Sequence, residues 1–209
     1  MSFRIAVLVS GEGSNLQAIL DTVHGRDGIE VVGVGSNRAE ARGLERAKKA
    51  GVETGVFDAI DYGSDRVRRD RVMGDWLGAH EIDLLVLAGF MEILSPEFIR
   101  RFQGRIINVH PSLLPAFRGI RAIEKAVEYG VRVTGVTVHF VDEGVDSGPI
   151  ILQQAFELPY SADLEAIEES VHAIEHELLP RAIRLLASGA VRIDPEDPRR
   201  VLIEERADV

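Results

Sequence analysis

The chain alternates apolar, β-branched runs with amphipathic stretches from residue 3 to about residue 190. Apolar runs that stop at glycine, proline or aspartate are typical of buried strands, whereas apolar side chains every three or four residues are typical of helices. The pattern predicts strands at 3–10, 29–36, 52–57, 82–91, 106–110, 133–140, 150–157 and, at an edge, 191–193. It predicts helices at 16–20, 39–50, 64–80, 95–102, 121–129 and 164–187, the last kinked or split by Pro180.

This alternation predicts an α/β protein. We expect a mostly parallel, Rossmann-like, doubly wound sheet of about seven strands, with helices on both faces and a mixed edge formed by the later strands. The 209 residues fit a single domain. Within it we expect an N-terminal half at about 1–105, a second half at about 106–190, and a peripheral charged tail at about 194–209.

The composition narrows the functional classes. There is no cysteine, which excludes disulfides and thiolate chemistry. Lys and Arg total 24 against 34 Asp and Glu, a net charge of -10, so binding to nucleic acid or to an anionic membrane is not expected. The first apolar run is too short for a membrane span and lacks the features of a signal peptide. We therefore expect a cytoplasmic protein with small-molecule partners.

A glycine-rich turn at 11–15 joins the first strand to the first helix. It allows two interpretations: a tight turn capped by Ser14 or Asn15, or a phosphate site formed by the N–H groups of Gly13, Ser14 and Asn15. Leu16 stands where a dinucleotide fingerprint needs its third glycine, and no Walker lysine follows. The sequence leaves both interpretations open.

The helix at 64–80 carries Arg66, Arg68, Arg69 and Arg71, interleaved with Asp65 and Asp70. A solvated face with i,i+4 pairs such as Arg66–Asp70 is the default expectation. The alternative is that Arg66 contacts an anion.

Asn108 and His110 close the strand at 106–110, just before Pro111. Side chains two residues apart in a strand share a face, and proline cannot extend a central strand. The pair therefore lies where strand becomes loop, which is the edge at which parallel α/β sheets bind ligands. His110 alone could equally be a satisfied polar residue at a strand end.

Asp146 and His139 complete the candidates for proton chemistry. A carboxylate beside an imidazole orients the ring and raises its pKa, and the Asn108 amide can donate to an oxyanion. Read alone, Asp146 is a turn residue and His139 a buried support. No Gly-x-Ser-x-Gly elbow and no His-Glu-x-x-His spacing occurs, so we expect direct transfer without a covalent intermediate and without a metal.

The sequence resembles the folate-dependent formyltransferases over residues 3–190. The matching segments are 10–19, 87–91, 108–115 (Asn-Val-His-Pro-Ser-Leu-Leu-Pro), 137–141 and 146–153. Within the family, the match is to members that formylate glycinamide ribonucleotide. The resemblance implies transfer of a formyl group from 10-formyltetrahydrofolate, a co-substrate, to the amine of that nucleotide in purine biosynthesis.

The resemblance also assigns roles to residues. Asn108 would donate to the oxyanion, His110 would polarise the formyl carbonyl, and Asp146 would hold His110 and relay a proton through water. Gly13, Ser14, Asn15, His172 and Glu175 would bind the phosphate and ribose. The folate would contact Arg66, Leu87, Phe90, Met91, Ile93, Leu94, Val141, Asp142 and Glu143, with Thr137 and His139 in support. A homodimer is a further expectation from the family.

Two departures from the family pattern leave alternatives open. Glu92 stands where many members carry a basic residue, and residues 115–121 lean toward the version found in enzymes that formylate methionyl-tRNA. The rival hypotheses are a domain that delivers the formyl group to methionyl-tRNA or to water, and a non-catalytic nucleotide-binding module. The negative charge and the phosphate loop count against tRNA, and the intact Asn108, His110 and Asp146 count against a non-catalytic module.

Overall fold

The computed structural model describes residues 2–63, 65–158 and 163–204. It divides into two compact units, Met1–Asn108 (unit 1) and Val109–Val209 (unit 2). The elements are β1 (Phe3–Val9), α1 (Ser14–Thr22), β2 (Ile29–Ser36), α2 (Arg42–Lys49), β3 (Thr54–Val56), α3 (Ala59–Tyr62), α4 (Arg66–Ala79), β4 (Leu84–Leu87), α5 (Pro96–Arg101), β5 (Ile106–His110), α6 (Ala122–Tyr129), β6 (Val133–Phe140), β7 (Ile150–Glu157), α7 (Leu164–Ala187), β8 (Val191–Ile193) and β9 (Val201–Ile203).

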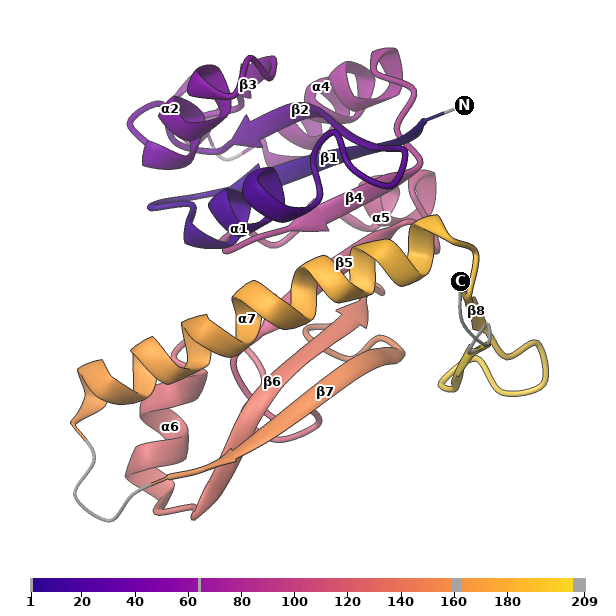
Figure 1. Cartoon of the computed structure of the whole chain (residues 1–209). Coiled ribbons are helices and arrows are strands. Elements are labelled where there is room, and N and C mark those ends of the chain that lie inside the picture. The colour runs from indigo at the N-terminus through magenta and orange to yellow at the C-terminus, as the bar shows by residue number, and fades with distance from the viewer. Residues whose placement is uncertain (1, 64, 159–162, 205–209) are drawn as a thin grey trace. The chain divides into compact units, whose positions relative to one another are not determined.

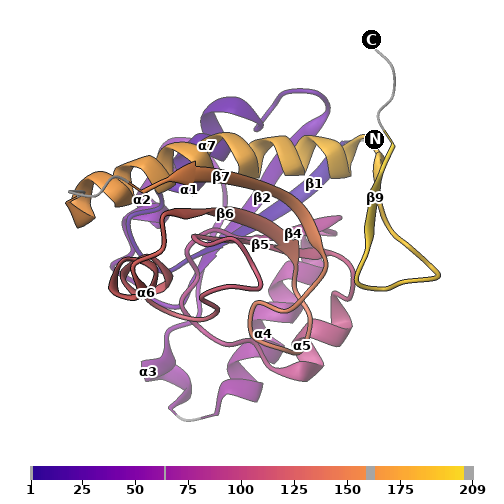
Figure 2. The ribbon, with the colours of Figure 1, turned by 90° about the horizontal axis from the view of Figure 1, so that it is seen from below.

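Seven strands form one sheet in the order β3-β2-β1-β4-β5-β6-β7. The strand pairs β1–β2, β1–β4, β2–β3 and β4–β5 are parallel. In contrast, β6 and β7 are antiparallel and run side by side in Figure 2. The predicted mostly parallel sheet with a mixed edge is therefore confirmed.

In unit 1, α1 lies on one face of the strands, and α4 and α5 lie on the other (Figures 1 and 2). Leu16, Ile19 and Leu20 give α1 its buried side, as their helical spacing predicts. The strands β1 and β4 are buried along almost their whole length, which is why they read as continuous apolar runs. This arrangement holds the ends of the strands, and the loops that follow them, in fixed positions.

In unit 2, α7 packs against β6, β7 and α6 (Figure 1). Of the two expectations for Pro180, a kink or a split, the split does not occur, because the helix continues through this residue. Proline removes one backbone hydrogen bond, but Leu178, Leu179 and Ile183 are buried around it, and this packing holds the helix together.

Several boundaries differ from the prediction. The segment 82–91, predicted as a strand that runs into a small-residue turn, is a strand only at Leu84–Leu87, and the expected turn lies at Gly89, where φ is +72°. The strand predicted at 52–57 shortens to Thr54–Val56, and the helix predicted at 39–50 begins at Arg42. The helix predicted at 64–80 is Arg66–Ala79, preceded by the short α3; Ser64 lies outside the described residues.

The predicted edge strand at 191–193 exists but belongs to a different sheet. It pairs with β9 in a separate two-stranded antiparallel sheet. The sequence pattern indicates strands but not their partners. The strand β9 was not predicted, because it is three residues long and lies within the charged tail. Residues 205–209 of that tail lie outside the described residues. Among the described helices, none combines the length and apolar character that crossing a membrane requires.

Candidate active site

The strand β5 ends in Asn108 and His110, as predicted. Alternation along the strand places the two side chains on the same side, and His110 is buried, with 5% of its surface exposed. Beyond it the chain turns at once, because the N–H of Ser112 donates to the carbonyl of His110 at 2.9 Å. The imidazole is therefore held at the end of a strand, with little freedom to move.

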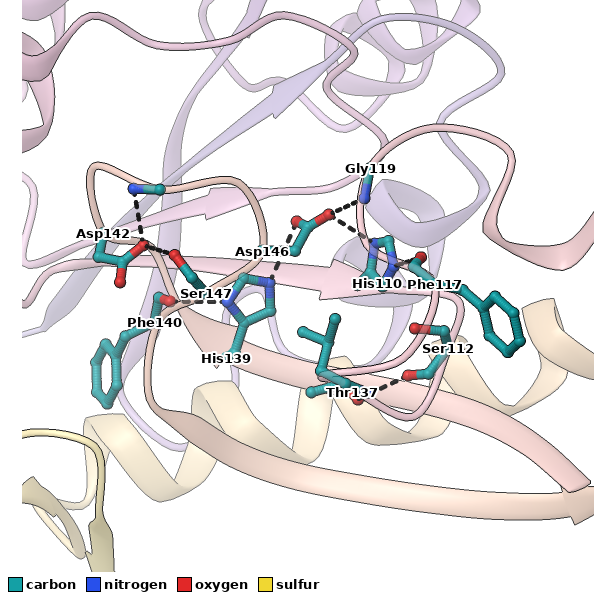
Figure 3. A network of polar contacts seen from close by, with 12 residues as sticks. His110, Ser112, Phe117, Gly119, Thr137, His139, Phe140, Asp142, Asp146 and Ser147 are labelled. Carbon is teal, nitrogen blue, oxygen red and sulfur yellow. Dashed lines mark hydrogen bonds and ion pairs between the residues drawn. The ribbon is translucent and has the colours of Figure 1, made fainter. Parts of the chain in front are cut away.

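Asp146 reaches His110 from the loop between β6 and β7 (Figure 3). Its Oδ2 lies 3.3 Å from Nδ1 of His110 and accepts a hydrogen bond from the N–H of Gly119 at 2.8 Å. The loop can approach the end of β6 because Gly148 has no side chain; a Cβ there would overlap the carbonyl oxygen of Phe140. The predicted pairing of Asp146 with His110 is present.

His139 contacts the other oxygen of the same carboxylate (Figure 3). Its Nε2 lies 3.7 Å from Oδ1 of Asp146, and its Nδ1 lies 2.8 Å from the carbonyl oxygen of Phe140. His139 is buried near the end of β6, as expected of a support. The carboxylate thus lies between two imidazole rings.

The electrostatics of this cluster favour an ionised carboxylate. Burial alone would raise the pKa of Asp146, but the His139 side chain, the charge of His110 and the N–H of Gly119 together lower that pKa to about 2. The pKa of His110 is lowered from its usual value, chiefly by burial, although Asp146 and the Phe117 carbonyl oppose this. At neutral pH the pair is therefore a carboxylate beside an imidazole that resists protonation.

The outward nitrogen of His110 contacts the loop that follows β5. Nε2 lies 3.0 Å from the carbonyl oxygen of Phe117, while Nδ1 faces Asp146. Both partners are acceptors, and a ring that donates to both must be an imidazolium. The position of Phe117 and the protonation of His110 are therefore coupled: withdrawing the carbonyl removes one of the two contacts that favour the charged ring.

The first half of this loop is fixed by a different set of contacts. Thr137 on β6 donates to the carbonyl of Ser112 at 2.7 Å and accepts from the N–H of Leu114 at 3.1 Å. Gln153 on β7 donates to Thr137 and to the carbonyl of Leu114, both at 2.9 Å. Thr137, expected as a supporting residue, thus contacts the loop that follows β5.

Backbone strain gathers in these loops. In the described part of unit 2, the non-glycine residues with left-handed backbone are Phe117, Arg121 and Asp146, with φ between 46° and 59°. Such conformations are unfavourable for most residues and cluster at functional sites. Two of the three, Phe117 and Asp146, contact His110 directly.

The glycine-rich turn of unit 1 is held against α2. Gly13 has φ of +70°, and a Cβ there would lie 2.7 Å from Cα of Gly43. The carbonyl of Gly11 accepts from the N–H of Gly43, and Nε of Arg46 donates to the carbonyl of Glu12 at 2.8 Å. The N-cap residue of α1 is Gly13, so neither Ser14 nor Asn15 occupies the capping position that one interpretation required. This geometry favours the phosphate interpretation.

Comparison with known proteins identifies relatives of this chain. A model of the formyl transferase family matches residues 3–183, which is most of the chain. The chain belongs to the formyl transferase family. Over 191 residues it is 41% identical to phosphoribosylglycinamide formyltransferase of Haemophilus influenzae, and the match covers 91% of this chain and 90% of that protein.

Two further relatives extend the comparison within the family. The structure of glycinamide ribonucleotide transformylase 1 from Symbiobacterium toebii superimposes with a TM-score of 0.91 at 46% identity, covering 97% of this chain and 94% of that one. The trifunctional purine biosynthetic protein adenosine-3 of Bos taurus is 45% identical over 191 residues. This chain covers 91% of its own length in that match but spans only 19% of the cattle protein.

The residues assigned to folate by the family resemblance differ in their exposure to solvent. Met91 and Ile93 are exposed, whereas Leu87 and Leu94 are buried. Phe90 is half-buried, and Arg66 is exposed at the start of α4. Leu87 and Leu94 thus pack beneath the surface, and their part in a folate site stays a prediction. In unit 2, Val141 and Asp142 are half-buried and Glu143 is exposed; Asp142 accepts from the hydroxyl of Ser147 at 2.6 Å.

The predicted Arg66–Asp70 pair on a solvated face is wrong. Asp70 is buried and is bonded by its neighbour Arg69, through Nε at 3.0 Å and NH2 at 2.9 Å. Arg69 also contacts Glu92 at 3.1 Å, so the acidic residue that departs from the family pattern has an internal cation beside it. The i,i+4 rule failed because these side chains turn inward between α4 and α5.

On α7 the structure places Glu175 inside and His172 outside. The ring of His172 stacks on that of His176, with centroids 6.2 Å apart. Burial and the nearby His172 lower the pKa of His176, which the sequence did not single out. Among the described residues, no group of His, Asp and Glu has the arrangement of a metal site.

Sequence reasoning missed the backbone groups of Phe117 and Gly119. Every residue except proline has the same N–H and C=O, so no pattern of residue types could have shown which ones reach His110 and Asp146. The sequence did carry one indication, the glycine at 119, whose φ of +78° the turn requires.

Proposed function

We propose that this protein transfers the formyl group of 10-formyltetrahydrofolate to the amine of glycinamide ribonucleotide, a step of purine biosynthesis. Family membership and the names of relatives that match over nearly their full length support this assignment. The net charge of -10 supports small-molecule substrates over nucleic acid. We further propose that the enzyme works in the cytoplasm.

The reaction needs no covalent enzyme intermediate. The amine nitrogen forms a bond to the formyl carbon, the carbonyl electron pair moves to oxygen, and the amine proton departs. When the C=O bond re-forms, the bond from the formyl carbon to N10 of the folate breaks, and N10 takes up a proton. The protein must therefore stabilise an oxyanion and move a proton from one nitrogen toward the other.

The observation that carries the proposal is the buried contact between His110 and Asp146, with Asn108 two residues away on the same strand. The Asn108 amide would donate to the oxyanion, a contact typically worth about 3–4 kcal/mol of barrier. His110 would polarise the formyl carbonyl beside it. With a pKa of about 2, Asp146 stays ionised, so its part is to orient His110 and a water and not to keep the proton.

The Phe117 carbonyl supports the assignment of Nε2 of His110 to the formyl group. A carbonyl oxygen 3.0 Å from this nitrogen stands in for the formyl oxygen, which is an acceptor of the same kind. The two oxygens compete for the N–H that Nε2 carries when the ring is protonated, so binding of the donor must displace Phe117 from His110. The segment that has to move is short, because residues 112–114 are bound separately by Thr137 and Gln153.

The phosphate of the nucleotide would be held by the N–H groups of Gly13, Ser14 and Asn15. Contacts with α2 hold the loop in place, and the N-cap residue of α1 is Gly13, which has no side chain. Backbone N–H groups at a helix start suit a phosphate, which carries negative charge and several acceptor oxygens. Glu175 and His172 are proposed to contact the nucleotide from α7.

A spectroscopic assay of donor deformylation tests the proposal. Purified protein is given 10-formyltetrahydrofolate with glycinamide ribonucleotide, with methionyl-tRNA, or with no acceptor. We expect turnover that depends on glycinamide ribonucleotide and exceeds the other two rates by at least about 100-fold, since effective positioning of the amine accounts for most of the rate. Equal loss of formyl without the amine would support the rival hydrolase, and turnover only with tRNA would support the other rival.

A further inference from the structure

Polar side chains of unit 1, all buried except the half-buried Glu92, form a continuous series of contacts outside the residues assigned to catalysis. In order they are Ser10, Asn37, Glu92, Arg69 and Asp70, and the series ends at the backbone N–H of Ser95. The hydroxyl of Ser10 donates to Oδ1 of Asn37 at 2.6 Å, and Nδ2 of Asn37 donates to Oε1 of Glu92 at 3.3 Å. Each donor therefore meets an acceptor, and the Asn37 amide is used at both ends.

The second half of the series is an ion-pair network. NH1 of Arg69 lies 3.1 Å from Oε2 of Glu92, and its other nitrogens bind Asp70. Arg69 and Asp70 are only 3% and 1% exposed. Buried ion pairs rarely add net stability over apolar packing, because desolvation of the charges offsets their attraction. Stability alone therefore does not account for a buried ion pair here, and we look to the backbone groups that the network positions.

The network fixes both ends of one short segment. Oγ of Ser10 accepts the N–H of Met91 at 2.8 Å, and Oδ2 of Asp70 accepts the N–H of Ser95 at 2.6 Å. Between these two points Met91 and Ile93 present 68% and 62% of their surface to solvent. A backbone anchored at both ends, bearing two large exposed apolar side chains, has the properties of a pre-organised surface for a flat apolar ligand.

We propose that Ser10, Asn37 and Glu92 are positioning residues that hold Met91 and Ile93 ready for the ring system of the formyl donor. This inference rests on the proposed function, which makes the donor a folate. The carboxylate of Glu92 contributes through its contacts with Asn37 and Arg69 and not by touching the ligand. Because Ser10 directly precedes the glycine-rich turn, the same hydroxyl also ties that turn to the folate segment.

The direction of the hydrogen bonds allows a sharp test. In Asn37→Asp, a carboxylate replaces the amide donor and faces Glu92, so the link is broken. In Glu92→Gln, one of the two carboxylate oxygens becomes an NH2 donor, so either Asn37 or Arg69 faces a donor in place of an acceptor. The double variant restores every link with the donor reversed: the new amide at 92 donates to the carboxylate at 37, and its oxygen accepts from Arg69. The total charge equals that of the wild type.

Binding of 10-formyl-5,8-dideazafolate, a stable analogue of the donor, is measured by calorimetry for all four proteins. We expect Kd to rise about 10-fold in each single variant and to return to within about 3-fold of wild type in the double variant, with kcat changed by less than about 3-fold throughout. A purely structural role predicts lower melting temperatures without this pattern in Kd. Failure of the double variant to recover affinity would overturn the proposal.

A matched pair of serine variants covers the case in which Asn37→Asp does not fold. Ser10→Ala removes a buried hydroxyl that accepts the N–H of Met91, and Ser36→Ala removes one that accepts the N–H of Arg38. Both serines are almost fully buried. We expect Ser10→Ala to weaken analogue binding about 10-fold and Ser36→Ala to leave it unchanged; equal effects would refute a specific role for Ser10.

The same experiments separate this inference from the proposed function. Wild-type protein that binds the analogue but never formylates glycinamide ribonucleotide would refute the proposed function, while the variants would still decide the role of the network. Wild-type protein that does not bind the analogue refutes both.

Discussion

Replacing Asp146 by asparagine removes a charge while preserving the shape of the loop. Asp146 has φ of +46°, and asparagine tolerates this left-handed conformation about as well as aspartate. The amide oxygen can still accept the N–H of Gly119, as Oδ2 does now at 2.8 Å. The lost element is the anion beside His110, so Asp146→Asn tests electrostatics with little change in backbone structure.

The substitution should lower both the stability of the protein and its catalytic rate. The side chain is 14% exposed, and its pKa falls from 3.8 to about 2, which corresponds to about 2 kcal/mol of folding free energy at neutral pH. Because the pKa is depressed, this contribution is present above pH 3.8 and is lost as the pH falls toward 2. Asp146→Asn should therefore lower Tm by roughly 4–8 °C. Without the carboxylate beside His110, kcat should fall about 1,000-fold, which corresponds to about 4 kcal/mol of activation free energy.

The assay is steady-state formyl transfer at a temperature where circular dichroism shows the variant to be folded. Asp83→Asn is the matched control, because Asp83 also accepts a backbone N–H, that of Arg4 at 2.8 Å, but has no part in the site. We expect the control to keep wild-type kcat and the KM for folate to change little in either variant. Near-normal kcat in Asp146→Asn would refute the role assigned to the carboxylate.

Three further predictions concern other parts of the site. Asn108→Ala should lower kcat by about 100- to 1,000-fold with little change in either KM, through loss of an oxyanion donor; a rise in KM alone would contradict that role. Gly13→Ala should raise the KM for glycinamide ribonucleotide at least 10-fold, whereas Gly25→Ala, also left-handed at φ +71° but with open space around it, should not; equal effects would refute a specific loop geometry. Burial lowers the pKa of His110, so as the pH falls below 6.5 the unfolded state takes up a proton on this residue before the folded state does. The free energy of unfolding measured in urea should therefore fall as the pH drops below 6.5, and His110→Gln should reduce this dependence on pH; an unchanged dependence in the variant would contradict the role of His110.

Much of the fold could be predicted because buried strands have a distinctive pattern. β5, β6 and β7 have the bounds that alternation and β-branched residues indicate, and Ser95 caps α5 by accepting the N–H of Phe98, as its position before Pro96 predicts. Strand partners were not predictable, because pairing depends on the path of the whole chain. That is why β8 was expected at an edge and is found paired with β9.

Some residues of the site could be predicted from the sequence in the same way, and others could not. Asn108, His110 and Asp146 could be singled out from residue types and their neighbours in sequence. The burial of Asp70 and the network from Ser10 to Ser95 could not, since Arg69 and Asp70 read as two more charges on a polar helix. The burial and partners of these residues depend on contacts between segments far apart in sequence. The contact of the Phe117 carbonyl could not be predicted for another reason, because every residue has a backbone carbonyl.

The most direct test of the central claim follows the formyl carbon itself. Donor carrying a ¹³C-labelled formyl group is incubated with enzyme and glycinamide ribonucleotide, and the label is assigned by NMR. We expect almost all label to appear as the formamide of the nucleotide, in proportion to tetrahydrofolate formed, and Asp146→Asn to lower the rate without changing the product. Label recovered as formate, or donor consumed without the nucleotide, would contradict direct formyl transfer to the amine.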